Sequence, residues 1–161
     1  MIQIKRQKLL ESWAKSPFLN KKDILIVGEC VESVYPEIFK RFARGRIILT
    51  TCPEVEQPVF GKLASFLTST KPRSIRVLTI DCSPHCYSLH AAVNEAYYIT
   101  KSNTPKKHFV ILDRSVNEIT PEAIRLSRYL SLTQKAIEKN PELIKELERY
   151  SLEQKRNFYL K

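Results

Sequence analysis

The sequence predicts an α/β fold, a single three-layer domain built on a mainly parallel sheet of about four strands. Four short apolar runs, rich in Ile, Val and Leu, are typical of strands that are buried on both faces. Amphipathic stretches with helical spacing lie between these runs. Strands and helices that alternate in this way form a parallel sheet with right-handed crossovers, so helices cover both of its faces. The length of 161 residues suits one such domain.

The N-terminal half is predicted to contain a short basic helix, two strands and two further helices. Residues 2–15 form the basic helix, with Trp13 among its apolar contacts, and Pro17 closes it. The strands cover 24–27 and 46–50, where β-branched residues and leucine follow one another. The two later helices are marked by apolar side chains at helical spacing, which are Val34, Ile38, Phe39 and Phe42, then Val59, Leu63, Phe66 and Leu67.

The C-terminal half is predicted to contain two strands, one helix between them and a helical tail. The strands cover 74–80 and 108–112, and His108, at the start of the second, is expected to be exposed. In the tail, Thr120-Pro121-Glu122 places a capping residue before proline at the first helical position, and Asn140-Pro141-Glu142 ends one helix and begins another. The apolar stripe of the middle helix consists of Leu89, Ala92, Val93, Ala96 and Tyr97.

The chain is predicted to be one domain in three segments. These are a basic helix with its lead-in (1–22), the α/β body (23–114) and C-terminal helices (115–161). The net charge of +10 belongs to the ends, because residues 1–22 and 101–161 carry +5 each and the rest is neutral. Basic ends can attract nucleic acid or an acidic protein partner, but solvated terminal helices also carry such charge.

Composition indicates a cytoplasmic protein. No stretch approaches the roughly 18 apolar residues of a membrane span, and the first residues lack the pattern of a secretory signal. Cytoplasmic thiols are normally reduced, which favours metal binding or catalysis over disulfides. Disulfides do occur in hyperthermophiles, and Ile, Lys, Arg and Glu are abundant here. Two pairings therefore stay open, Cys30 with Cys52 and Cys82 with Cys86.

Four cysteines follow three consecutive predicted strands. Cys30, Cys52 and Cys82 each end an apolar run, and Cys86 comes four residues after the third. Carboxyl ends of parallel strands share one edge of the sheet, where ligands usually bind. Thiolates are the ligands of zinc and of iron–sulfur clusters. We therefore expect a metal site formed by these four residues, with an iron–sulfur cluster or zinc as cofactor.

The spacing of the candidate ligands matches no standard metal motif. Paired C-x2-C knuckles are absent, and the nearest local group is Cys82-x3-Cys86-x3-His90. His85 and His90 are alternative ligands if one cysteine is structural. Free cysteine is also among the most buried residue types, so some of the four could simply pack in the core.

Cys86 is also a candidate nucleophile. A thiol at a helix N-terminus is pushed toward thiolate by the backbone dipole, and His85 could act as its base. In such a cysteine-dependent enzyme, acids at the strand ends would bind or polarise the substrate. These acids are Glu29, Glu54, Asp81 and Asp113.

Several common α/β functions are disfavoured by missing motifs. The chain has only three glycines and therefore neither G-x-G-x-x-G nor G-x4-G-K-[ST]. The leading hypothesis is a metal- or iron–sulfur-binding redox or electron-transfer protein whose basic ends dock an acidic redox partner. The alternatives are the cysteine-dependent enzyme and a metal-free binding module whose basic helices contact nucleic acid.

Overall fold

A computed structural model describes residues 6–56, 58–151 and 153 of the chain. The chain divides into two compact units, Met1–Pro121 and Glu122–Lys161. All six strands belong to the first unit, and helices α6 and α7 belong to the second. Within the described residues, no helix combines the length and the apolar composition needed to cross a bilayer.

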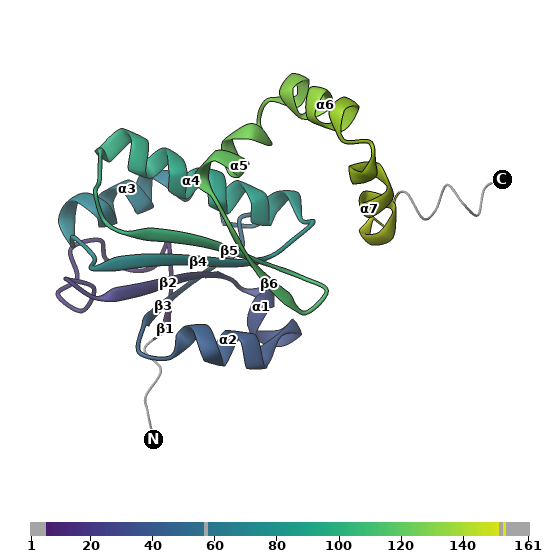
Figure 1. The fold of residues 1–161 in the computed structure, drawn as a ribbon. Helices are drawn as coiled ribbons and strands as arrows, with labels where there is room; N and C mark the ends of the chain where they lie inside the picture. The colour runs from purple at the N-terminus through teal and green to yellow at the C-terminus, as the bar shows by residue number, and fades with distance from the viewer. Residues whose placement is uncertain (1–5, 57, 152, 154–161) are drawn as a thin grey trace. The chain divides into compact units, whose positions relative to one another are not determined.

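The first unit is built on one six-stranded sheet in the order β1-β3-β2-β4-β5-β6 (Figure 1). Every neighbouring pair is parallel except β5 and β6. The predicted α/β class and mainly parallel sheet are confirmed, with two more strands than expected. The strands are β1 (Arg6–Lys8), β2 (Asp23–Gly28), β3 (Ile47–Thr51), β4 (Ser74–Ile80), β5 (Lys106–Leu112) and β6 (Ser115–Ile119).

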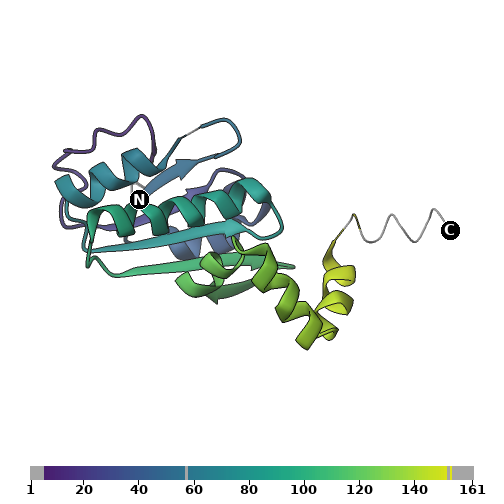
Figure 2. The same ribbon diagram turned by 90° about the horizontal axis from the view of Figure 1, so that it is seen from above.

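Helices cover both faces of this sheet (Figures 1 and 2). Helices α1 (Cys30–Val34) and α2 (Pro36–Ala43) lie on one face, and α3 (Phe60–Ser69) and α4 (Pro84–Thr100) lie on the other. Strand β2 is buried on both sides because its side chains alternate between two cores. Ile24 and Ile26 pack with α3 and α4, whereas Leu25 and Val27 pack with α1 and α2. This explains the continuous apolar run.

The path of the chain creates a topological switch point at the carboxyl edge of the sheet. Strand β2 lies between β3 and β4 in the sheet. The chain leaves β2 into α1 on one face and leaves β4 into α4 on the opposite face. The carboxyl ends of β2 and β4 therefore form the topological switch point, where open α/β sheets usually bind ligands.

The predicted basic N-terminal helix is wrong for the residues that the structure describes. Arg6–Lys8 form strand β1, which pairs in parallel with β3. The next amide, that of Leu9, donates to the carbonyl oxygen of Thr50 at 2.8 Å, and Leu9 is fully buried. Trp13 is 67% exposed instead of being a helix contact. Strand pairing and burial of Leu9 outweigh the local helical pattern, and residues 2–5 lie outside the described part.

The predicted helical segment 115–161 begins too early. Asp113 and Arg114 both have positive φ, at 46° and 66°, which is the geometry of a two-residue type I′ hairpin turn. This turn folds β6 back against β5. Asparagine or glycine usually marks such a turn, so the sequence offered little signal. The single helix expected from Pro121 to Asn140 is interrupted, so that it forms α5 (Pro121–Leu126) and α6 (Leu130–Lys139). The break at Asn140-Pro141 is as predicted, and α7 (Glu142–Tyr150) follows it.

A pair of histidines is buried between α4 and the sheet. His90 is 2% exposed and His108 is 1% exposed, so the expectation that His108 is exposed is wrong. The Nδ1 atoms of the two rings lie 2.9 Å apart, and Nε2 of His90 lies 2.9 Å from Oγ1 of Thr79. Burial lowers the pKa of His90 to about 4. Burial, together with the charges of His90 and Lys106, lowers the pKa of His108 to about 3.

Because His90 and His108 are buried in the neutral form, we expect the protein to lose stability in mild acid. Both folded-state pKa values lie below the ordinary value of 6.5, so the unfolded chain binds more protons between about pH 3 and 6.5. The free energy of unfolding should therefore fall as the pH drops through this window, by up to about 1.4 kcal/mol per histidine and pH unit. Urea unfolding at pH 7.5 and pH 5.0 measures the change.

The control for this prediction is the triple variant Thr79→Val/His90→Leu/His108→Leu, which replaces the whole polar group by apolar side chains. Its stability should depend much less on pH over the same range, because no buried imidazole remains to be protonated. An equally steep pH dependence in the variant and the natural protein would contradict this assignment.

Candidate functional site

The four cysteines all lie at the carboxyl edge of the sheet or in the helices that leave it. Cys30 is the first residue of α1, just beyond β2, and Cys52 follows β3 directly. Cys82 follows β4, and Cys86 lies in the first turn of α4. Cys30 and Cys82 are exposed, Cys52 and Cys86 are partly buried, and all four are free thiols. Neither disulfide considered from the sequence is formed.

Gly28 leaves room for the Cys86 thiol at the switch point. A Cβ atom placed on Gly28 would lie 3.9 Å from the Sγ atom of Cys86. It would also lie 3.9 Å from side-chain carbons of Thr79 and Val31, which come from β4 and α1. The Cys86 sulfur therefore lies against the last residue of β2, between the two strands from which the chain leaves to opposite faces.

Electrostatics links Cys86 to two of the other thiols. Burial raises the pKa of Cys86, and the charges of Cys30 and Cys52 raise it further. Hydrogen bonds with the Ser83 side chain and the Ile80 backbone act in the opposite direction, but they do not outweigh burial. The expectation that the helix N-terminus lowers this pKa is therefore wrong. Cys30 and Cys52 therefore lie near enough to Cys86 to affect its pKa.

Cys82 stands apart from this group. Its φ of 72° lies in the left-handed region, and its backbone N–H donates to Oδ1 of Asp81 at 2.9 Å. It does not contribute to the pKa shift of Cys86. Over residues 6–56 and 58–151, no group of three or more His, Cys, Asp and Glu side chains is arranged to hold a metal ion.

The histidines do not join the cysteines. Nδ1 of His85 lies 3.7 Å from Oε2 of Glu54, in the loop after β3. His90, the other alternative ligand, has both ring nitrogens engaged in the buried pair with His108 and Thr79. The suggestion that His90 is a ligand is therefore corrected, because the side chain faces the sheet and not the carboxyl edge.

A charged cluster beside the thiols was missed by the sequence analysis. Nζ of Lys8 lies 2.9 Å from Oε1 of Glu56 and 3.3 Å from Oε1 of Glu29. Hydrogen bonds to these two carboxylates raise the pKa of Lys8. The other oxygen of Glu56 accepts the backbone N–H of Cys52 at 3.2 Å, so the cluster ties the end of β1 to the Cys52 loop. The sequence analysis missed these ion pairs of Lys8 because it placed Lys8 in a helix.

The cluster also keeps Glu56 ionised. Partial burial of Glu56 on its own would raise its pKa, but hydrogen bonds from Lys8 and from the Cys52 backbone produce a net lowering. A carboxylate that stays charged in this position stabilises both the Lys8 ammonium and the turn that presents Cys52.

The thiols should differ in their reactivity toward alkylation. The thiolate attacks iodoacetamide and displaces iodide, so burial and a raised pKa should make Cys86 react several-fold more slowly than exposed Cys82 at pH 7.5. Mass spectrometry of peptides over a time course measures both rates. In urea, where the environment of the fold is lost, the two rates should converge. Preferential labelling of native Cys86 would contradict the raised pKa and favour a nucleophilic role.

Comparison with known proteins identifies one family. Searches of curated proteins and of solved structures give no match to this chain. A family model described as Rossmann-like domain matches residues 16–158, which cover most of the chain. This match agrees with the parallel sheet, the helices on both of its faces and the switch point between β2 and β4. The chain therefore belongs to the Rossmann-like domain family.

Proposed function

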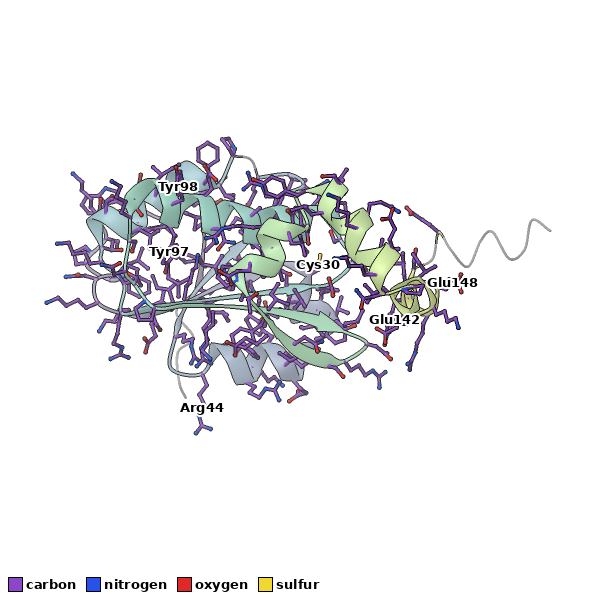
Figure 3. The ribbon with its side chains drawn as sticks, turned by 45° about the horizontal axis from the view of Figure 1, so that its top comes forward. Cys30, Arg44, Tyr97, Tyr98, Glu142 and Glu148 are labelled. Atoms are coloured by element: carbon purple, nitrogen blue, oxygen red, sulfur yellow. The ribbon has the colours of Figure 1, made fainter. Side chains whose placement is uncertain are left out.

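We propose that this protein binds an iron–sulfur cluster at the switch point and acts in electron transfer. The observation that carries the proposal is that Cys30, Cys52 and Cys86 follow three different strands, β2, β3 and β4, at the carboxyl edge of one parallel sheet. Figure 3 labels Cys30 at this edge, far from Tyr97 and Tyr98 at the opposite end of α4. Cys82 is the proposed fourth ligand.

The positions of these residues allow the thiols to converge. Cys30 and Cys82 are exposed, so their side chains can change rotamer without breaking core packing. Gly28 leaves space next to the Cys86 sulfur. A 4Fe–4S cluster brings its own sulfide ions and binds one cysteine at each iron, so its cysteine sulfurs stand further apart than those around a single zinc ion. No group of three or more ligand side chains is arranged for a metal ion in the described residues, so the proposal requires the thiols to move together when a cluster binds.

The alternative functions have less support. A Cys86 nucleophile needs a lowered pKa and a nearby base, but burial raises this pKa and His85 pairs with Glu54. A dinucleotide site of the usual type needs a glycine-rich turn after the first core strand, where this chain has only Gly28. The nucleic-acid alternative relied on basic helices that include one at the N-terminus, but Arg6–Lys8 form a strand of the sheet.

The net charge of +10 suggests the chemistry of the electron partner. A basic protein associates fastest with an acidic one, and this attraction weakens as the salt concentration rises. An acidic redox protein is therefore the proposed partner.

Anaerobic purification tests the proposal. We expect a brown protein with broad visible absorbance and stoichiometric iron and acid-labile sulfide, either directly or after reconstitution with iron and sulfide. A colourless protein that takes up neither would overturn the proposal. Stoichiometric zinc without iron would keep a thiolate site but exclude the electron-transfer role.

Cysteine variants identify the ligands. Single changes of Cys30, Cys52 or Cys86 to serine should each lower the iron content by more than half and lower the melting temperature of the reconstituted protein, because metal binding stabilises the folded state. The matched control is His85→Ala, which lies in the same region and should retain both iron and stability. Unchanged iron content in all three serine variants would contradict the assignment.

A further inference from the structure

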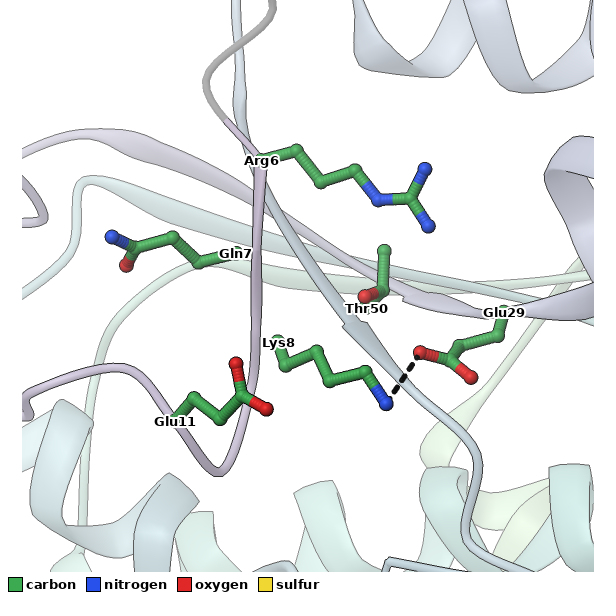
Figure 4. Close-up of a pocket in the computed structure, with 6 residues that line it drawn as sticks. All are labelled: Arg6, Gln7, Lys8, Glu11, Glu29 and Thr50. Carbon is green, nitrogen blue, oxygen red and sulfur yellow. Dashed lines mark ion pairs between the residues drawn. The ribbon is translucent and has the colours of Figure 1, made fainter.

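A second candidate site is an open pocket of about 490 Å³ beside strand β1 (Figure 4). This volume is in the range of small-molecule sites. The pocket does not contain any of the four cysteines, although Glu29 precedes Cys30 in the chain. Its lining consists of Arg6, Gln7, Lys8, Glu11, Glu29 and Thr50.

Strand register places the polar groups of this pocket together. Arg6 and Lys8 are two residues apart on β1, so their side chains leave the same face of the sheet. Lys8 is paired in register with Thr50 on β3. Figure 4 shows the Lys8 side chain reaching toward Glu29, with Thr50 between the Arg6 and Lys8 side chains.

The positive charges of the pocket are already neutralised. Arg6 forms an ion pair with Glu32, and Lys8 forms ion pairs with Glu29 and Glu56. Glu11 adds a carboxylate for which no ion pair occurs among the described residues. Together with Glu32 and Glu56, which lie outside the lining, the two cations are accompanied by four carboxylates, a local excess of two negative charges in a chain whose net charge is +10.

Thr50 supplies an independent indication of a ligand. It is 2% exposed, it lines the pocket, and its Oγ1 atom has no hydrogen-bond partner in the described part of the chain. Buried hydroxyl groups are normally hydrogen-bonded, and leaving one unpaired is costly. A ligand N–H in the pocket would donate to Oγ1 of Thr50.

We infer that this pocket binds a small organic diamine in its doubly protonated form. Ammonium groups donate only, so they suit the Glu11 and Glu29 carboxylates and the Thr50 oxygen. Two positive charges offset the two excess negative charges. An anion would have to displace carboxylates that already pair with Arg6 and Lys8, and a neutral molecule would leave the negative charge in place. This inference does not depend on the proposed cluster.

Calorimetry with three molecules of equal chain length tests the inference. We expect 1,4-diaminobutane to bind the full-length protein at one site, more weakly as salt is added. Neutral 1,4-butanediol and anionic succinate should not bind measurably. Binding of succinate or butanediol in preference to the diamine would overturn the inference, as would the absence of diamine binding at low salt.

Variants place the binding in this pocket. Glu29→Gln and Thr50→Val should each weaken diamine binding, the former by at least about tenfold, because a charge-assisted hydrogen bond is lost. Glu11→Gln should also weaken diamine binding. Because Glu11 is exposed and is not part of the core, this variant should fold normally even if Glu29→Gln or Thr50→Val does not. Glu37→Gln on α2, outside the pocket, is the matched control and should bind as the natural protein does.

The pocket and the cluster can be tested separately. Cys86→Ser should lose iron if the proposed function is correct, yet it should bind the diamine normally. Unchanged diamine affinity in Glu29→Gln, Glu11→Gln and Thr50→Val would overturn the pocket assignment whatever the iron content.

Discussion

Burial of β2 on both faces is the constraint on which the first unit depends. Its alternating side chains join two separate cores, Ile24 and Ile26 on one side and Leu25 and Val27 on the other. A strand buried in this way needs a hydrogen-bonded neighbour at each edge, and β3 and β4 fill these places. Because the chain then departs to opposite faces of the sheet, the carboxyl end of β2 opens onto the switch point. The central position of one apolar strand thus determines where a ligand can bind.

Thiol side chains and a cluster of charged side chains both lie at this edge of the sheet. The Cys86 thiol lies beside the end of β2, whereas the Lys8 cluster lies toward β1 and holds the Cys52 loop through Glu56. Glu29 and Cys30 are consecutive, so one connection between β2 and α1 serves both places. The charged and thiol side chains can lie on the same edge because the carboxylates have ion pairs of their own, while the Cys86 sulfur lies beside Gly28.

Desolvation governs the titratable groups of the interior. It keeps the His90–His108 pair neutral, and at Cys86 it outweighs the hydrogen bonds with Ser83 and Ile80. It also acts on Glu56, but there the hydrogen bonds from Lys8 and from the Cys52 backbone prevail. The sign of each shift therefore depends on whether a partner of opposite charge or a hydrogen-bond donor compensates for the loss of water. None of these balances can be read from the residue type alone.

The sequence by itself determined the fold class, four of the six strands and the helical character of the tail, because apolar periodicity reports burial and local propensity directly. It also placed the four cysteines near one edge, since strand ends in a parallel sheet share a direction. Tertiary structure alone decided the rest. Residues 6–8 became a strand through pairing with β3, and His90 and His108 met across 18 positions of the chain. The pocket required Lys8, Glu29 and Thr50 from three separate segments, and such long-range contacts leave no periodic trace in a single sequence.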